Sequence, residues 1–544
     1  MTLSLLLFQA LVAGLEPSQT SQAGIPPWPD GAEYMDGAVH LFKEGRFAIH
    51  VGGETHPSRY PYGYSVLQVA ALALGGDPVQ APYRVNNVAG LALLLSIFAW
   101  TAWRRSWVTG ALAALLLAVQ PSFVILCRAP MSEISAMLPT LWGVLLLYSF
   151  ARGGSWKTAA AGSLLLGLAL HFRLSALLLM GFVAAALAVR FKAQGRFPRR
   201  GLLACLGGLA AAAVPLALYH AVTFGAPWKT GYGYWLSSSG SPWALFSLSN
   251  LWPNLKMLAL EAIQGEEQAT TAFLVGEGSY FGPASLVLLA LGVLYHLRQR
   301  TPRAFAAAGA IFLMGQLLYA YPLGRLYFPA VVLAVPAAAA MLAEVLPRLC
   351  KENRWGRLVP LCLLLLAALA GWPGKRSDSE IGDLWRSHPL GAFSLEYEAV
   401  QQIRARGEGP LLLLTDMNPP YLHAMLALGK EPSRQPLRGD APDGQRSAGD
   451  AAAHVAADPW TAPLLDAHQY RFNPASFTFA EAQRQTLVDR ALSQHRQVWA
   501  VTALYPAASA QQTFPAPAGY RWEVVWSNRL QGGVARLLPA STPR

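Results

Sequence analysis

The sequence predicts a polytopic α-helical membrane protein with about 11 transmembrane helices, outer-loop amphipathic helices and a small exported C-terminal α/β domain. Of its 544 residues, 53% are hydrophobic and only 13% are charged, against about 25% charged residues in ordinary soluble domains. Long apolar stretches alternate with short basic clusters. This composition excludes an ordinary soluble enzyme and also a disordered chain, which needs low hydrophobicity and high charge.

Five basic clusters between the apolar stretches predict the orientation of the spans. Together they hold sixteen Lys and Arg residues and a single acid, Glu352. Cytoplasmic loops carry an excess of Lys and Arg, so we expect all five on the cytoplasmic side. The net charge of +12 then follows from the topology and gives no reason to expect a nucleic-acid partner. The clusters lie at 104–105, 152–157, 190–200, 298–303 and 348–357.

The segment between the second and third clusters decides the number of spans. Its 32 residues between Lys157 and Arg190 would measure about 48 Å as one helix, whereas the hydrocarbon core is about 30 Å thick. Two short helices that turn near His171-Phe172-Arg173 fit better and keep both clusters on one side. Because each helix is short of a full span, we expect the turn to be recessed from the outer surface.

With eleven spans, every basic loop lies on the cytoplasmic side. We count the first stretch as a span because a cytoplasmic N-terminus and eleven crossings place every basic loop in the cytoplasm. A signal peptide, for which no small-x-small cleavage site stands out, or a start upstream of Met1 would also fit. The predicted spans are 2–16, 84–103, 107–125, 133–151, 158–171, 174–191, 202–222, 282–297, 304–320, 325–346 and 358–372.

Residues 1–372 are expected to form the transmembrane catalytic domain, with a first outer loop at 17–83 and a second at 223–281. Residues 373–544 differ in composition and predict an exported α/β domain of unknown role. None of the four cysteines lies after residue 362, so this domain would fold without disulfides. Its predicted helices are 394–406 and 479–494, and its predicted strands are 411–415, 497–502, 522–526 and 534–538.

The first outer loop holds the most informative residues. Asp30 opens a predicted amphipathic helix over about residues 31–44, and the segment Tyr60-Pro61-Tyr62-Gly63-Tyr64 follows after a glycine turn. Residues 64–76 are too short to span comfortably and are expected to lie along the membrane surface. The apolar face of the amphipathic helix is expected to hold Tyr34, Ala38, Leu41 and Phe42.

This order of residues resembles integral-membrane glycosyltransferases of the GT-C type, in particular aminoarabinose-transferase-like and protein-mannosyltransferase-like enzymes. In that family the first outer loop carries the catalytic Asp, which falls on Asp30, and a Pro-Pro-Gly-Tyr motif falls on Pro61-Tyr62-Gly63-Tyr64. The resemblance covers roughly residues 1–370. Further matching segments follow in chain order, namely Arg128–Glu133, Gly167–Arg173, Phe224–Tyr232 and Gly324–Pro329.

The resemblance implies a multi-pass protein of the bacterial inner membrane that takes a polyprenyl-phosphate-linked sugar as donor. The sugar would pass, usually with inversion, to a lipid, glycan or protein acceptor on the outer face. An attacking hydroxyl needs a base, the role implied for Asp30. The departing phosphate needs fixed positive charge, which Arg173 and Arg325 can supply. Glu133 would be a second catalytic or metal-coordinating carboxylate.

The candidate carboxylates also have structural explanations. Asp30 and Glu33 have the spacing of a capping box, and a cap and a base are compatible roles. Glu133 lies in the first turn of a predicted span, where the helix dipole favours acids. Asp36, further along the same predicted helix as Asp30, is expected on a solvated face.

The basic and aromatic candidates are open to a second interpretation as well. Arg173 lies in an otherwise apolar segment, where a charge indicates function, yet it can also snorkel to the outer headgroups. His171 is expected to pack in the turn. The remaining candidates, Tyr60, Tyr62 and Tyr64, either line the sugar site or belong to an interfacial aromatic belt.

The cysteines and histidines show no metal-site spacing, and the sequence requires no cofactor. A divalent cation held by two carboxylates from different loops is compatible with it. Two other functions remain open. A transporter or flippase for lipid-linked sugars would predict inverted repeats and broken helices at the midplane. In a non-catalytic envelope assembly protein, loss of Asp30 would affect little beyond helix stability.

Overall fold

The computed structural model describes most of the membrane region and parts of the C-terminal region. The predicted spans 2–16 and 358–372 lie outside the described residues. The described residues are 29–51, 54–76, 81–128, 130–232, 246–264, 283–298, 303–319, 324–349, 406, 411–415, 488–489, 491–493, 497–502, 516–527 and 533–541.

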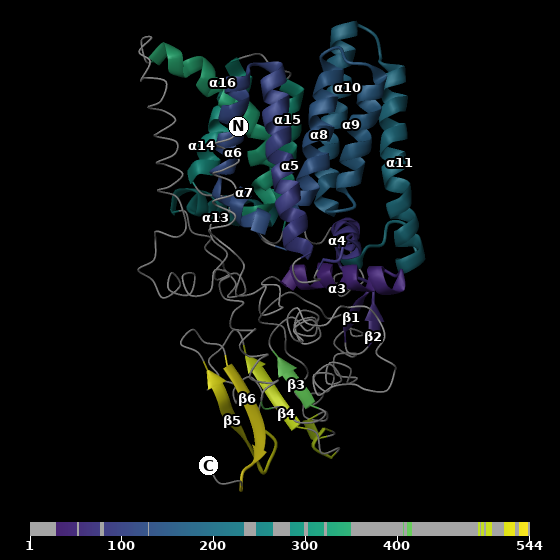
Figure 1. Ribbon diagram of the computed structural model, residues 1–544, viewed down its shortest axis with the longest axis vertical. Helices are drawn as coiled ribbons and strands as arrows, with labels where there is room; N and C mark the ends of the chain where they lie inside the picture. The colour runs from purple at the N-terminus through teal and green to yellow at the C-terminus, as the bar shows by residue number, and fades with distance from the viewer. Residues whose placement is uncertain are drawn as a thin grey trace.

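A bundle of long helices forms the upper half of the view in Figure 1. Within the described residues, five segments are long and apolar enough to cross a membrane: Ala81–Arg104, Glu133–Ala151, Leu174–Gln194, Arg199–Phe224 and Arg325–Glu344. The helical, multi-span class is therefore confirmed, whereas the count of eleven spans stays a prediction. The bundle helices are α5 (Ala81–Arg104), α6 (Trp107–Ala118), α7 (Pro121–Arg128), α8 (Glu133–Ala151), α9 (Trp156–Ala169), α10 (Gly181–Gln194), α11 (Arg199–Phe224), α14 (Pro283–Arg298), α15 (Arg303–Leu317) and α16 (Phe328–Leu349).

One predicted span is interrupted. The stretch 107–125 was expected as a single helix, but α6 ends at Ala118 and α7 begins at Pro121. Proline has no N–H to donate and disfavours the helical conformation in the residue before it. The side chain of Gln120 at this break donates to Ser285 Oγ of α14 over 2.5 Å, which satisfies a polar group inside an apolar bundle.

The predicted helical hairpin at 158–191 is present, but only its first arm is short. α9 has 14 residues, whereas Leu174–Gln194, with 21 residues, is long enough to cross a membrane. α9 ends at Ala169, a short turn follows, and the chain continues through the 3-10 helix η1 (Leu174–Met180) into α10. The first outer loop covers this turn, because the N–H of Gly63 donates to the carbonyl of His171 over 2.6 Å. A Cβ at Gly63 would lie 2.5 Å from that oxygen, so only glycine permits this approach.

Small residues hold the middle of the bundle together. A Cβ at Gly162 of α9 would lie 3.0 Å from the carbonyl oxygen of Gly143 in α8, and one at Gly208 of α11 would clash with the carbonyl oxygen of Ala160. Close backbone approach of this kind is typical of helices packed in lipid. The opposite face of α11 exposes apolar side chains such as Leu203 and Val222.

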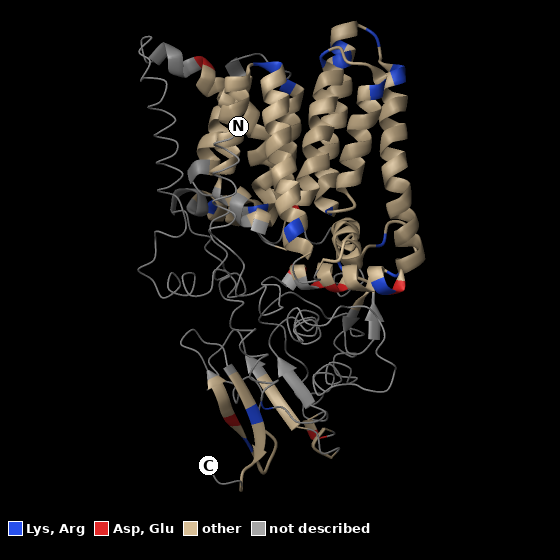
Figure 2. Ribbon diagram, in the orientation of Figure 1, with Lys and Arg blue, Asp and Glu red and all other residues tan. Residues whose placement is uncertain are grey.

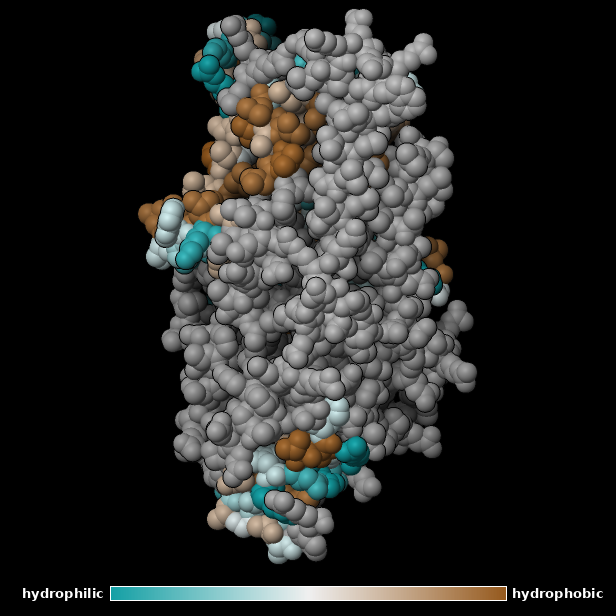
Figure 3. All heavy atoms as spheres, turned by 90° about the vertical axis from the view of Figure 1, so that its left-hand side faces the viewer, coloured by the Kyte–Doolittle hydropathy of each residue, from teal (hydrophilic) through white to brown (hydrophobic). Residues whose placement is uncertain are grey.

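Apolar side chains also cover the outer side of the bundle. Figure 3 shows them gathered on the face that is at the left in Figure 1, where α14 lies with α13 (Leu251–Gln264). Leu286, Val293 and Leu294 of α14 are about half exposed, and Trp252 of α13 is 73% exposed. A soluble monomer rarely exposes so large an apolar patch, so this surface fits a lipid environment.

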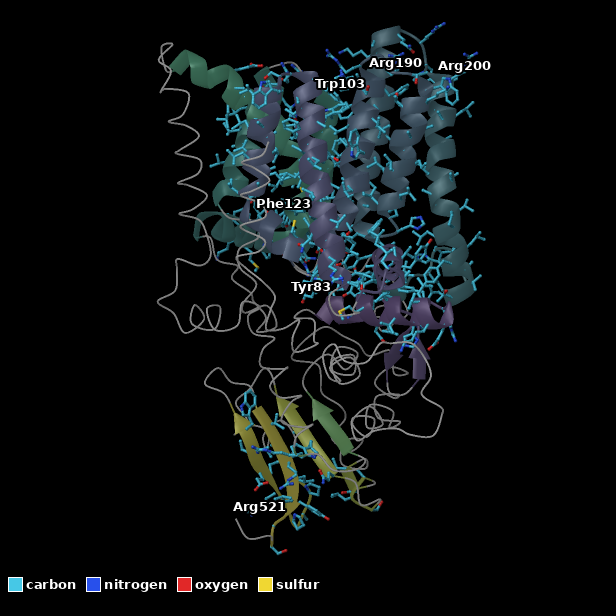
Figure 4. All side chains as sticks on the ribbon, in the orientation of Figure 1. Tyr83, Trp103, Phe123, Arg190, Arg200 and Arg521 are labelled. Atoms are coloured by element: carbon cyan, nitrogen blue, oxygen red, sulfur yellow. The ribbon has the colours of Figure 1, made fainter. Side chains whose placement is uncertain are left out.

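Most Lys and Arg side chains of the bundle gather at one end (Figure 2). Arg190 and Arg200 lie at that end, whereas Tyr83 lies near the other (Figure 4). Two contacts also show that the first three clusters lie close together. Arg104 donates to Ser149 over 3.3 Å, and Arg190 lies 5.5 Å from the ring centre of Phe150, two residues that come just before Arg152. These clusters lie at one end of the bundle, as expected for clusters on one side of a membrane, and their assignment to the cytoplasmic side stays a prediction.

The first outer loop lies across the opposite end of the bundle (Figure 1). It contains α3 (Pro29–Glu44), the antiparallel strands β1 (Ile49–Val51) and β2 (Glu54–His56), and α4 (Gly63–Ala73). Tyr34 and Ala38 are buried as expected, but Phe42 is 44% exposed.

Asp36, expected on a solvated face, is instead buried. Its Oδ1 lies 3.6 Å from Nε2 of His40, which follows one turn later in α3. A buried carboxylate needs such a partner, and the helical pattern alone does not reveal one.

Four strands of the C-terminal region form one sheet with the order β3-β4-β6-β5. The strands are β3 (Leu411–Thr415), β4 (Gln497–Thr502), β5 (Tyr520–Ser527) and β6 (Gly533–Pro539). β3 pairs with β4 in parallel, and the other two pairings are antiparallel. All four strands lie where the sequence predicts them, whereas the export of this region as a domain stays a prediction.

The topology leads to a direct test. A reporter fused near Gln194, in the last turn of α10, should be active only in the cytoplasm, and one fused after Arg544 only in the exported compartment. The reason is that basic loops stay on the cytoplasmic side. Alkaline phosphatase and green fluorescent protein fusions report the two compartments. A cytoplasmic C-terminal fusion would refute the eleven-span topology.

Candidate active site

Asp30 is placed by the first turn of α3 and is held from two directions. Its Oδ1 accepts a hydrogen bond from the hydroxyl of Tyr60 over 2.6 Å. Its Oδ2 lies 3.0 Å from Nη2 of Arg325, 295 residues further along the chain. Arg325 belongs to the short helix η6 (Gly324–Tyr327), which leads into α16. The first outer loop and the last described bundle helix therefore meet at Asp30.

Glu133 is the first residue of α8, and its side chain is only 3% exposed. Nη1 of Arg173 lies 2.5 Å from its Oε1, and Nε of Arg325 lies 3.5 Å from the same oxygen. Arg173 reaches this position from the turn between α9 and η1. Arg325 thus lies between Asp30 and Glu133, and four residues predicted from the sequence form one continuous ion-pair chain.

A second buried ion pair, which the sequence did not reveal, supports the first. The side chains of Glu33 and Arg59 are 1% and 6% exposed and pair directly. Glu33 also lies 3.4 Å from the backbone N–H of Arg59. Glu33 is therefore directed at the Tyr-rich segment of the outer loop and not at the start of α3, as a capping box would require.

The guanidinium of Arg59 lies 5.3 Å from the ring centre of Tyr60, the residue that donates to Asp30. The pair between Glu33 and Arg59 thereby supports the position of Tyr60. The sequence contained one signal for this role, since Arg59 directly precedes the Tyr60–Tyr64 segment.

The three candidate tyrosines lie in different surroundings. Tyr60 contacts Asp30. Tyr62 packs edge-on against His171 and Tyr219, with ring centres 5.2 and 5.1 Å away. Tyr64 is fully buried, and its hydroxyl donates to the carbonyl of Pro82 over 3.0 Å. Of the three, only Tyr60 joins the ion-pair chain in the described contacts.

Two further aromatic residues border the site. The ring of Tyr34 lies 4.9 Å from that of Tyr60, and the ring of Tyr232 lies 5.7 Å from it on an edge. The hydroxyl of Tyr34 lies 3.0 Å from Ser132 Oγ, which also lies 3.4 Å from Nη1 of Arg173. Neither tyrosine was predicted as a site residue, although Tyr232 ends one of the matching segments.

The electrostatics of Asp30 favour its ionised form. Burial alone would raise the pKa of this carboxyl, but Arg325, then Arg59, and the hydrogen bond from Tyr60 together hold it below its ordinary value. For Glu33, burial outweighs the effect of Arg59 and raises the pKa. Burial also raises the pKa of Tyr60 well above its ordinary value, so its hydroxyl stays a donor.

A pocket of about 390 Å³, which includes space open to solvent, adjoins the ion-pair chain. Glu133, Arg173 and Arg325 form its polar end, and Ser175 and Thr140 add hydroxyl groups. The rest of its wall is mainly apolar. The apolar lining residues are Ala136, Met137, Ala176, Leu179, Phe312, Leu326 and Pro329.

The described residues contain no group of three or more His, Cys, Asp or Glu side chains placed to hold a metal ion. Asp30 and Glu133, two carboxylates from different parts of the chain, both contact Arg325. A guanidinium therefore fills the position between them. This arrangement offers a carboxylate that can accept a proton, next to two guanidinium groups that can bind an anion.

The pair between Glu33 and Arg59 predicts a pH-dependent stability. Arg59→Ala would leave Glu33 buried without its partner, at a cost of about 3–5 kcal/mol near neutral pH. Loss of Arg59 raises the pKa of Glu33 further, so a proton binds the folded form as the pH falls. Since the folded pKa then lies above the unfolded one, acidification relieves the cost. The Tm deficit against wild type, measured in detergent, should therefore shrink between about pH 7.5 and pH 5.

The double variant Glu33→Gln with Arg59→Ala is the matched control. Glutamine does not ionise, so the deficit of the double variant should not depend on pH in this range. A deficit of Arg59→Ala that is equal at both pH values would show that Glu33 is not the titrating group.

Comparison with known proteins gives the same fold. The chain is similar to ArnT from Cupriavidus metallidurans bound to undecaprenyl phosphate, with a TM-score of 0.56 and 15% identity over 99% of each chain. ArnT from the same organism in the apo state matches with a TM-score of 0.50 and 12% identity, over 98% of this chain and 97% of that one. The apo oligosaccharyltransferase of Archaeoglobus fulgidus gives a TM-score of 0.47 and 13% identity, over 92% of this chain and 68% of that one.

No protein-family model and no curated protein sequence matches the chain. The two ArnT structures nevertheless span nearly its whole length. The chain therefore has the GT-C type membrane glycosyltransferase fold, as the resemblance of its outer-loop motifs implied.

Proposed function

We propose that this protein is a glycosyltransferase that moves a sugar from a polyprenyl-phosphate-linked donor to an envelope acceptor on the outer face of the membrane. The observation that carries this proposal is the ion-pair chain of Asp30, Arg325, Glu133 and Arg173 beside a pocket with apolar walls. The fold adds support, because ArnT with the same fold was solved bound to undecaprenyl phosphate.

Asp30 is the general base in this proposal. Its carboxylate takes the proton of the acceptor hydroxyl while the hydroxyl oxygen attacks the anomeric carbon. The bond between that carbon and the phosphate oxygen breaks, and its electron pair leaves with the polyprenyl phosphate. The hydrogen bond from Tyr60 orients the carboxylate for this transfer.

Arg173 and Arg325 are the phosphate-binding residues in this proposal. Both reach the polar end of the pocket, where their guanidinium groups can stabilise the charge that develops on the departing phosphate. Glu133 contacts both guanidinium groups and is nearly buried. We therefore assign Glu133 the role of a positioning residue for the two arginines.

The apolar wall of the pocket suits the first units of a polyprenyl chain. Met137, Leu179 and Phe312 come from α8, η1 and α15, so the wall is built between separate elements of the bundle. The turn between α9 and η1 supplies Arg173 beside this wall. A phosphate and the chain attached to it can thus be bound side by side.

The proposal places the protein in the bacterial inner membrane as a multi-pass chain, with residues 373–544 as an exported domain. The site lies at the end of the bundle opposite the basic clusters, next to α3. An exported sugar acceptor would reach it from that side. Tyr62 and Tyr64 are then assigned to the support of the outer loop.

The role of Asp30 can be separated from helix capping. Asn caps a helix about as well as Asp, and Arg325 keeps Glu133 as an ionic partner. Asp30→Asn should therefore fold, with some loss of stability from the broken pair with Arg325. Asn cannot accept the proton, so transfer should fall by roughly 100-fold or more. The assay measures transfer of labelled sugar from a polyprenyl-phosphate donor, normalised to protein level.

Asp36→Asn is the matched control for this assay. Asp36 is a buried acid of the same helix, and its described ion pair is with His40. Its variant should keep transfer activity in the folded fraction. An active Asp30→Asn variant would remove Asp30 from the catalytic residues.

The role of Arg173 is tested by charge and by shape. Arg173→Ala should weaken use of the donor more than it lowers the amount of folded protein, since it removes a charge-assisted contact to the phosphate. Lys at 173 should keep part of the activity, because it retains the charge without the planar fork. The KM for the donor and kcat are measured for both variants. Full activity of Arg173→Ala would assign the phosphate to Arg325 alone.

A further inference from the structure

The guanidinium of Arg325 makes contacts on three sides. Nη2 lies 3.0 Å from Asp30 Oδ2, Nε lies 3.5 Å from Glu133 Oε1, and Nη1 lies 3.7 Å from the sulfur of Met131. Its side chain is only 9% exposed. The residue assigned to the phosphate is therefore paired with the residue assigned as the base.

Among the described residues, the charges that pair at the site balance one another. Three carboxylates, of Asp30, Glu33 and Glu133, face three guanidinium groups, of Arg59, Arg173 and Arg325. A phosphate at the polar end of the pocket adds an anion to this balanced set. It must share Arg325 with Asp30, and Arg325 stabilises each anion less when the other is present.

We infer that Asp30 and the donor phosphate compete for Arg325, so that donor binding is what frees Asp30 to act as the base. This inference rests on the proposed function. Arg325 is the largest influence that opposes burial and lowers the pKa of Asp30. When the phosphate draws on Arg325, the proton affinity of Asp30 rises toward the value that suits a base near neutral pH.

The freed carboxylate does not lose its position. The hydroxyl of Tyr60 still donates to its Oδ1, and Tyr60 is supported by Arg59 and the buried Glu33. Orientation and charge compensation of the base thus come from different residues. An acceptor that reaches the site before the donor meets a weakened base, so the donor should bind first in productive turnover.

If the phosphate weakens the contact between Arg325 and Asp30, Asp30 must weaken phosphate binding to the same extent. This reciprocity can be tested. Asp30→Asn removes the competing charge, so purified full-length protein in nanodiscs should bind undecaprenyl phosphate about 5- to 10-fold more tightly than wild type. In an Arg325→Ala background, the same substitution should give no gain. The dissociation constant of the labelled lipid is measured for wild type, both single variants and the double variant, with Asp36→Asn as the control.

The outcomes separate this inference from the proposed function. If Asp30→Asn leaves the affinity unchanged, or raises it equally with and without Arg325, competition at Arg325 is refuted while the phosphate site stands. If Arg173→Ala and Arg325→Ala bind the lipid as well as wild type does, the phosphate site and the inference both fail. The Tm of each variant identifies any that fails to fold, and Arg325→Lys then replaces Arg325→Ala with a reduced gain expected.

Discussion

The ion pairs of Arg325 are the constraint on which the rest of the site depends. A guanidinium that is largely removed from water needs anionic partners, since an uncompensated buried charge is costly. Arg325 finds them in Asp30 of the first outer loop and Glu133 of α8. One side chain therefore fastens α3 to the bundle and brings the catalytic candidate to the pocket. The packing of Gly63 against His171 makes a second attachment of the same loop.

The length of α9 and the cover of the outer loop explain why Arg173 meets Glu133. α9 has 14 residues, fewer than the roughly 20 that a full span needs. The short α9 keeps Arg173 beside Glu133, and the outer loop covers the turn. Ionic contacts there act in a lower dielectric than at the surface, which strengthens attraction to a phosphate. The short length of α9 thus helps to place Arg173 in the site.

The sequence predicted what depends on local pattern and missed what depends on pairing at a distance. The bounds of α8 and the strand β4 agree with their predicted ranges, because hydrophobic runs and breakers define both. The motif segments singled out Glu133 and Arg325, and the apolar surroundings of Arg173 singled out that residue. The structure brings the three together, and their roles stay predictions. The pair between Glu33 and Arg59 was missed, because their spacing along the chain does not reveal that the two charges meet.

The tyrosine segment shows the same limit within five residues. The sequence gives no reason to treat Tyr60, Tyr62 and Tyr64 differently. Because α4 begins at Gly63, however, their side chains lie in different surroundings. The hydroxyl of Tyr60 donates to the carboxylate of Asp30, whereas the hydroxyl of Tyr64 donates to the backbone carbonyl of Pro82. The chain therefore divides one motif between chemistry and support. In the proposed mechanism, Tyr60 stays hydrogen-bonded to Asp30 while Arg325 binds the phosphate, so the site changes its charge pairing without moving its base.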